Sequence, residues 1–154
     1  MTDKHLEVLK ADINREINNL LELEREMKDI LEEAKDSPRK IEMRAAGSVL
    51  HDFYCAVERI FERIGNNIDG ELPEGSDWHI QLLERMAVPI EGIRQSVINS
   101  ESLEDLREIL AFRHIFRNVY GFELKWERFR HLVNKLPEVT EKFEEDIKSF
   151  LSSL

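Results

Sequence analysis

Cysteine, glycine and proline are scarce in this chain of 154 residues, which has one cysteine, 6 glycines and 4 prolines. The single cysteine, Cys55, excludes an intrachain disulfide and gives no sign of an oxidising compartment. So few turn-forming residues argue against a sandwich or a barrel, whose short strands need frequent turns. No apolar run approaches membrane-spanning length, and the N-terminus is charged where a secretory signal would be apolar. We therefore expect a soluble, cytoplasmic protein with no membrane partner.

Positive charge is in short supply as well, because 22 Lys and Arg residues face 32 Asp and Glu residues, and the net charge is -10 at pH 7. This excess of negative charge argues against non-specific electrostatic binding of nucleic acid, which needs clustered Lys and Arg to neutralise phosphates. It leaves room for a small, locally basic site, and it would suit docking onto a basic partner.

Helix-forming residues are what the chain has in abundance, with 42% hydrophobic and 35% charged side chains. Apolar residues recur at spacings of three and four, which places them on one stripe of a helix. The longest stripe is Leu6, Leu9, Ile13, Ile17, Leu20, Leu23 and Met27. A helix with such a stripe must find a partner surface, and a chain of this length suits one domain. We predict an all-α, single-domain helical bundle of about five or six helices over residues 1–154.

Capping and helix-breaking residues give approximate bounds for these helices. The first helix is predicted to begin at a Thr2 or Asp3 cap and to end near Asp36. The others are expected from Ser37-Pro38 to Ile64 with Gly65 as the stop, from Trp78 to about Ala87, from a Ser102 cap to about Tyr120 with Gly121 as a left-handed stop, from Trp126 to Asn134, and from Pro137 to the end. Aromatic residues at helical spacing are predicted to lie in the core, namely Phe53, Tyr54, Phe61, Trp126, Phe129 and Phe143.

The densest group of reactive polar side chains is the segment Arg113-His114-Ile115-Phe116-Arg117-Asn118-Val119-Tyr120. On a helix, one side carries its polar residues, with Arg113, Arg117 and Tyr120 in line and His114 and Asn118 alongside. The apolar residues fall on the opposite side and can dock into the bundle. Such a group suits a phosphodiester, because Arg offers forked donors to phosphate oxygens and His moves protons near neutral pH. The structural alternative is a solvated helix end whose cations favour the helix dipole.

This segment resembles the signature of HEPN proteins, in which an Arg and a polar residue are followed by a His a little more than one turn later. In HepT-like toxins the pattern extends to Arg-Asn-x-Leu-x-His-x-Tyr at the end of a helix. Position by position, Arg113 matches the Arg, His114 the polar residue, Phe116 the apolar residue and Tyr120 the Tyr, while Asn118 stands where the His is expected. The Trp78-His79 helix start and the run from Tyr120 to Leu124 are also similar to HepT-like proteins.

The resemblance implies a metal-independent endoribonuclease toxin with no cofactor, which acts as a homodimer with the motif facing the cleft between subunits. Its implied partners are an RNA substrate and a minimal nucleotidyltransferase antitoxin, which in related pairs modifies the motif Tyr with AMP. Arg113 would stabilise the phosphate, with Arg117 as a second phosphate contact. Tyr120 would be a phosphate contact or the modified residue.

Asn118 is the departure from this pattern, because an amide cannot act as the general base or acid that the family's His supplies. His114 lies one turn before Asn118 and is one hypothesis for the missing proton-transfer group. Normal cleavage by a His114→Ala variant would refute it. A gain of cleavage by Asn118→His in an otherwise inactive chain would instead indicate a member that binds RNA and does not cut it.

Two other hypotheses for the function of the chain remain. The first is a non-catalytic helical module that binds a nucleotidyltransferase partner or its substrate, and the second is an acidic interaction protein without nucleotide contact. His51 and Cys55 lie four apart on a predicted helix, but two ligands are not a metal site, so we expect no metal. His79 is predicted to be a local hydrogen-bonding residue. His5 and His131 are predicted to lie on the surface.

Overall fold

The computed structural model describes residues 1–154 as five α-helices and no strand, which confirms the predicted all-α class. The helices are α1 (Asp3–Ala34), α2 (Lys40–Ile64), α3 (Trp78–Met86), α4 (Ser100–Asn118) and α5 (Trp126–Ser152). A single π-helical turn, η1 (Gly65–Asp69), extends α2, and a 3₁₀ turn, η2 (Gly121–Glu123), separates α4 from α5. None of the five helices combines the length and the apolar character that crossing a membrane requires.

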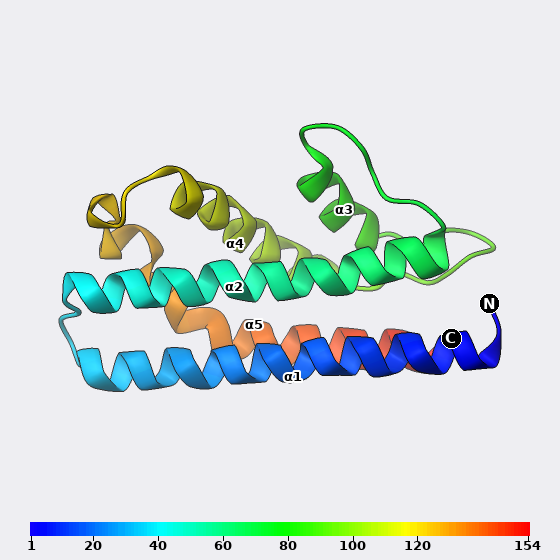
Figure 1. The fold of residues 1–154 in the computed structure, drawn as a ribbon, viewed down its shortest axis with the longest axis horizontal. Coiled ribbons are helices and arrows are strands. Elements are labelled where there is room, and N and C mark those ends of the chain that lie inside the picture. Colours follow the sequence, from blue (N-terminus) through cyan, green and yellow to red (C-terminus); the bar gives the residue numbers. More distant parts are fainter.

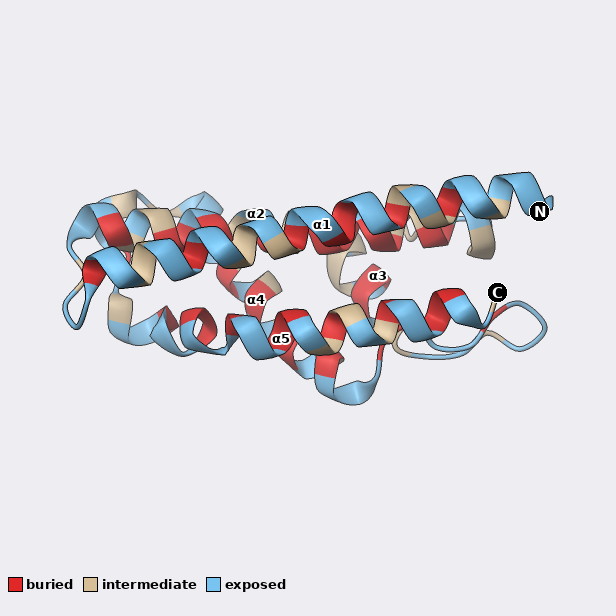
Figure 2. Cartoon of the chain, turned by 90° about the horizontal axis from the view of Figure 1, so that it is seen from below, coloured by how far each residue is buried: buried red, intermediate tan, exposed pale blue.

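The helices form an elongated bundle in which α1 and α2 run antiparallel, side by side along its length (Figure 1). α5 returns along α1, while α3 and α4 lie on the other side of α2, so both chain termini lie at the same end (Figure 1). α2 is the central helix, because it contacts all four of the others. The buried stripes of α1 and α5 face inward, and their outer faces are exposed (Figure 2).

One continuous cluster of 33 buried hydrophobic residues forms the core. Its largest fully buried side chains include Tyr54, Phe53, Phe61 and Phe143. The predicted core aromatics are confirmed, except that Trp126 is only half-buried at the start of α5. Burial of these apolar side chains drives the amphipathic helices to pack together, because each large side chain removed from water stabilises the folded state by about 1.5–3 kcal/mol.

The prediction of two helices in the C-terminal part was wrong, because α5 runs unbroken through Pro137. Proline removes one backbone donor and usually ends or kinks a helix. Here Val133, Leu136, Val139 and Phe143 continue a single buried stripe across it. Packing of that stripe against the core therefore outweighs the local cost of the proline.

Several predicted helix ends also need correction. α2 begins after Arg39, not at Ser37, and the Glu42 carboxylate closes its first turn by accepting from the Arg39 backbone N–H at 2.8 Å. α4 begins earlier than its predicted Ser102 cap, because the Asn99 side chain accepts from the Ser102 backbone N–H at 2.8 Å. α2 ends at Ile64 with Gly65 as its C-cap, as predicted, and the π-helical turn η1 then continues the chain to Gly70, where φ is 90°.

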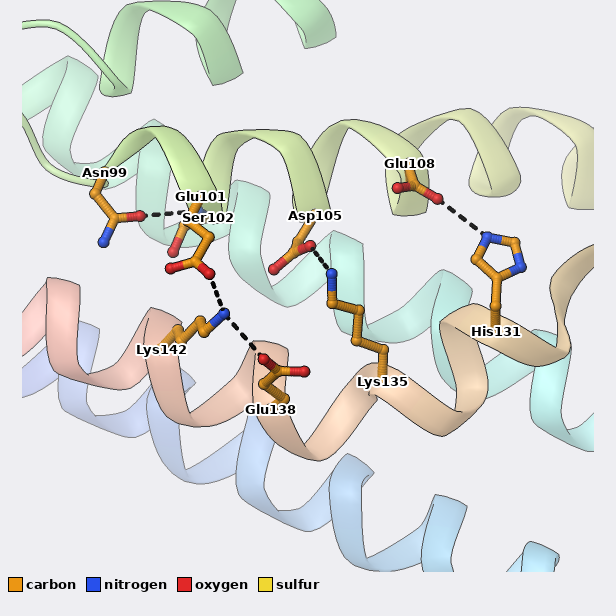
Figure 3. A network of polar contacts seen from close by, with 9 residues as sticks. All are labelled: Asn99, Glu101, Ser102, Asp105, Glu108, His131, Lys135, Glu138 and Lys142. Carbon is orange, nitrogen blue, oxygen red and sulfur yellow. Dashed lines mark hydrogen bonds and ion pairs between the residues drawn. The ribbon is translucent and has the colours of Figure 1, made fainter.

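Charged side chains tie α4 to α5 along the line where the two helices meet (Figure 3). Lys135 Nζ lies 2.7 Å from Asp105 Oδ1, and Lys142 Nζ lies 2.6 Å from Glu101 Oε1. The Asp105 carboxylate raises the pKa of Lys135, and Lys142 lowers the pKa of Glu101. These pairs supplement the apolar contact between α4 and α5.

Candidate functional site

The segment singled out in the sequence covers the last turns of α4 and the chain that follows. α4 ends at Asn118, where the side-chain amide donates to the His114 carbonyl at 2.7 Å. Val119 is extended, so Tyr120 lies outside the helix. The prediction that Tyr120 shares one helical face with Arg113 and Arg117 was therefore wrong. Gly121 is not a left-handed stop, because it opens η2 instead.

Phe116 anchors this segment to α2. An added Cβ at Gly47 would lie only 2.8 Å from Phe116 Cε1, so the absence of a side chain at Gly47 lets the ring approach the helix backbone. The Phe116 ring also lies 5.6 Å from the His51 ring and 5.9 Å from that of Phe112. Aromatic packing of this kind holds the last turns of α4 in place.

Arg113 is half-buried between α4 and α2, and its surroundings are unusual for an arginine. Its Nε is buried and forms no hydrogen bond within the protein, and the same holds for the fully buried Tyr54 hydroxyl on α2. Burial and the nearby Glu58 carboxylate raise the pKa of Tyr54, while the Arg113 guanidinium acts in the opposite direction. Tyr54 therefore stays neutral, and Arg113 retains donors that no protein carboxylate uses.

The other predicted site residues lie at the surface. His114, Arg117 and Asn118 are exposed, and Tyr120 is 72% exposed. The Tyr120 ring stacks on Phe122 with centroids 5.3 Å apart and planes 8° from parallel. The structure therefore separates Arg113, which faces inward, from a solvent-facing group of His114, Arg117, Asn118 and Tyr120.

Neither Arg113 nor Arg117 takes part in an ion pair, although arginines elsewhere in the chain do. Arg44 on α2 adds a third guanidinium, because it packs directly against the backbone of Gly121. Sequence reasoning missed Arg44, since nothing in the sequence links a residue near the start of α2 to the end of α4. Arg44 and Arg117 form a local basic surface at the end of α4 on an acidic protein, and Arg113 lies inward of it.

An apolar groove of about 590 Å³ lies on the opposite side of α4, between α4, η2 and the start of α5. Its floor includes Phe112, Phe129 and Leu132, and Ile115 on its wall is 53% exposed. Charged residues form its rim, among them His131, whose Nε2 lies 3.0 Å from Glu108 Oε2 (Figure 3). The groove and the basic surface thus flank the same stretch of α4.

A second histidine outside the segment has a buried partner. His79 Nδ1 lies 2.7 Å from Oε2 of Glu58 on α2, and the Glu58 side chain is only 7% exposed. The Trp78 ring lies 3.8 Å from the His79 ring. His79 is therefore a hydrogen-bonding residue as predicted, but its partner is on another helix and not local.

The His51–Cys55 pair is held loosely, with Sγ 3.9 Å from Nδ1 of His51, and Asp52 Oδ1 lies 3.2 Å from the same nitrogen. No three His, Cys, Asp or Glu side chains are arranged so that they could hold a metal ion.

A five-helix bundle with unpaired guanidiniums at the end of one helix defines a small all-α protein with a local basic site. The chain belongs to the HepT-like protein family, whose sequence model matches residues 45–154. This family is related to HEPN proteins, so the resemblance found in the sequence is confirmed at the family level. No curated protein and no solved structure gives a significant match to the chain.

Proposed function

We propose that this protein is a HEPN-type toxin that cleaves RNA without a metal ion, with Arg113 as its main phosphate contact. The observation that carries this proposal is the Arg113 guanidinium, which is half-buried at the family's motif position and free of any carboxylate. Membership of the HepT-like family supports the class of activity.

The chemistry follows from what the arginines can stabilise. Attack of a ribose 2′-hydroxyl on the neighbouring phosphorus builds negative charge on the phosphate oxygens. Arg113 would donate to those oxygens, and Arg117 and Arg44 would hold adjacent phosphates along the strand. Preorganised charges and donors of this kind are usually the largest single source of transition-state stabilisation.

Assembly as a homodimer belongs to the same proposal. The groove beside α4 is lined mostly by apolar side chains, and Ile115 and Phe122 next to it are 53% and 66% exposed. Exposed apolar surface of this kind favours contact with another protein surface. A second copy docked there would bring the C-terminal parts of the two α4 helices together.

An antitoxin partner is the other part of the proposal. A minimal nucleotidyltransferase would modify Tyr120 with AMP and so block the basic surface. The exposure of Tyr120 at 72% supports its access to such an enzyme. The bulk and negative charge of the nucleotide next to Arg44 and Arg117 would oppose RNA binding.

One observation favours the alternative of a non-catalytic binding module. Asn118 stands at the expected His position, and its amide donates to the His114 carbonyl, so it caps α4 and does not transfer protons. A module of this kind would bind the partner or its RNA through the same arginines. A gain of cleavage on Asn118→His substitution would identify it.

Induced expression of the chain tests the proposal. The native chain is expected to slow growth and fragment cellular RNA, while the Arg113→Ala variant, produced at the same level, leaves both unaffected. Equal growth and intact RNA in the two cultures would contradict a toxin of this type.

A further inference from the structure

The Glu58–His79 pair joins α2 to α3 and lies outside the Arg113 segment. The Glu58 carboxylate is buried, whereas the His79 side chain is 30% exposed at the first turn of α3. Their contact, 2.7 Å between Nδ1 and Oε2, fixes the imidazole plane and places a proton on Nδ1. The Nε2 atom at the other edge of the ring is then free to accept a proton.

This pair borders the surroundings of Arg113. Glu58 and Tyr54 lie one turn apart on the same face of α2. Both the Glu58 carboxylate and the Arg113 guanidinium influence the buried Tyr54 hydroxyl, from α2 and α4 respectively. Arg113 and His79 therefore lie on two different helices, α4 and α3, that pack against the same part of α2.

We propose that the RNA site extends from Arg113 on α4 to His79 on α3, over the buried Tyr54 and Glu58 of α2, and that His79 is its general base. In the step, Nε2 of His79 takes the proton from a ribose 2′-hydroxyl as that oxygen bonds to phosphorus. The bond from phosphorus to the 5′-oxygen breaks, and this oxygen takes a proton from water. The products are a 2′,3′-cyclic phosphate and a 5′-hydroxyl, and His79 then returns its proton to solvent.

Glu58 is the positioning residue of this pair. A buried carboxylate on Nδ1 orients the ring and stabilises the imidazolium that forms when Nε2 accepts the proton. His114 lacks such support, because it is exposed and makes no side-chain hydrogen bond to a carboxylate. The chemistry of this inference rests on the proposed ribonuclease function, while the location of the site does not.

Three variants test it with the purified full-length chain. His79→Gln is expected to lower the rate of RNA cleavage about 10²–10⁴-fold, with little change in the Kd for RNA. Glu58→Gln is expected to lower the rate by less, because an amide oxygen still accepts from Nδ1 but carries no charge. His5→Gln is the control, since His5 is exposed in the first turn of α1 and lies outside both the proposed RNA site and the groove beside α4. Its rate should equal that of the unchanged chain.

A second readout follows the histidine ring signals by NMR during titration with a 2′-O-methyl RNA oligonucleotide, which cannot be cleaved. The His79 signals are expected to shift and those of the exposed His5 to stay in place. Thermal unfolding of each variant checks that the fold is intact.

The outcomes separate the two proposals. Cleavage by the unchanged chain that His79→Gln leaves at its full rate overturns the inference and spares the ribonuclease function. If the unchanged chain does not cleave, the ribonuclease function and the general-base role both fail. The location of the site then stands if the His79 signals shift with the oligonucleotide, and it falls if they do not.

Discussion

Two arginines, Arg94 and Arg113, extend into the bundle, and they differ in what their guanidinium groups meet. Arg94 is buried against Asp69, with Nε 2.6 Å from Oδ1, and it also donates to the carbonyls of Arg85, Val88 and Gln95. Every donor of Arg94 is thus directed at a structural partner, whereas Arg113 has none. The same side chain serves the fold in one place and is available to a ligand in the other.

This contrast predicts different costs for the same substitution. Arg94→Met leaves the Asp69 carboxylate buried and unpaired, which should lower the free energy of unfolding by about 3–5 kcal/mol. Arg113→Met loses no hydrogen bond within the protein and should cost less than about 1 kcal/mol. Urea unfolding followed by circular dichroism measures both. Equal losses would show that Arg113 is also a structural residue.

At the scale of the elements, the sequence predicts helices more reliably than their ends. The periodic stripes of α1 and α2 predict both helices, because burial of a continuous face decides their existence. Pro137 misleads, since a local rule about proline cannot register how much apolar surface α5 buries on both sides of it. The end of α4 is likewise set by tertiary contacts, namely Phe116 on Gly47 and Arg44 on Gly121.

The candidate site, too, can be predicted only in part from the sequence. Residues from Arg113 to Tyr120 are adjacent along the chain, so the sequence alone identifies them as a group. Arg44, Tyr54 and Glu58 come from another helix, and only folding brings them to the segment. Sequence reasoning therefore located the motif but could not find the other half of its surroundings.

The junction of α1 and α5 carries an unfavourable set of carboxylates, which makes a pH-dependent prediction. Burial and the neighbouring Glu144 raise the pKa of Glu24 above its ordinary value of 4.5. The ionised form of Glu24 is therefore disfavoured in the folded protein. The destabilisation by ionised Glu24 is fully present at a pH well above the raised pKa, and it disappears as the pH falls through that pKa.

Glu24→Gln should accordingly raise the free energy of unfolding near neutral pH, by less than about 1 kcal/mol. The gain should shrink towards zero as the pH falls below 4.5. Thermal or urea unfolding at a series of pH values measures it. Glu32→Gln, at an exposed position of the same helix, is the control and should change little at any pH. A gain for Glu24→Gln that does not vary with pH would contradict this assignment.

At the scale of the whole molecule, α1 lies outside residues 45–154, which the family model matches, yet it is part of the core. Its buried stripe packs on α2 and α5. Each of its large apolar side chains contributes about 1.5–3 kcal/mol, so together they rival the whole stability of a typical domain. A chain that starts at Ser37 should therefore lose its cooperative thermal transition. An unchanged melting temperature would contradict this.

Dimerisation is the second prediction at this scale. Ile115→Glu should weaken a dimer built on the groove beside α4, because it places a charge in an apolar contact. Val88→Glu is the matched control, since Val88 is similarly exposed, at 50% against 53%, but lies in the connection after α3. Sedimentation equilibrium of the two variants and the unchanged chain measures the effect. Equal association in all three would exclude this groove as the interface.

Cleavage of a labelled RNA by the purified chain in EDTA is the sharpest test of a metal-independent ribonuclease site at the Arg113 segment. We expect the unchanged chain to cleave, the Arg113→Ala variant to cleave about 10²–10³-fold more slowly, and the Arg130→Ala variant to cleave at the rate of the unchanged chain. Arg130 is an exposed arginine on α5 whose ion-pair partner is Glu127. RNA that stays intact, or that the Arg113→Ala variant cuts at the same rate, would contradict the claim.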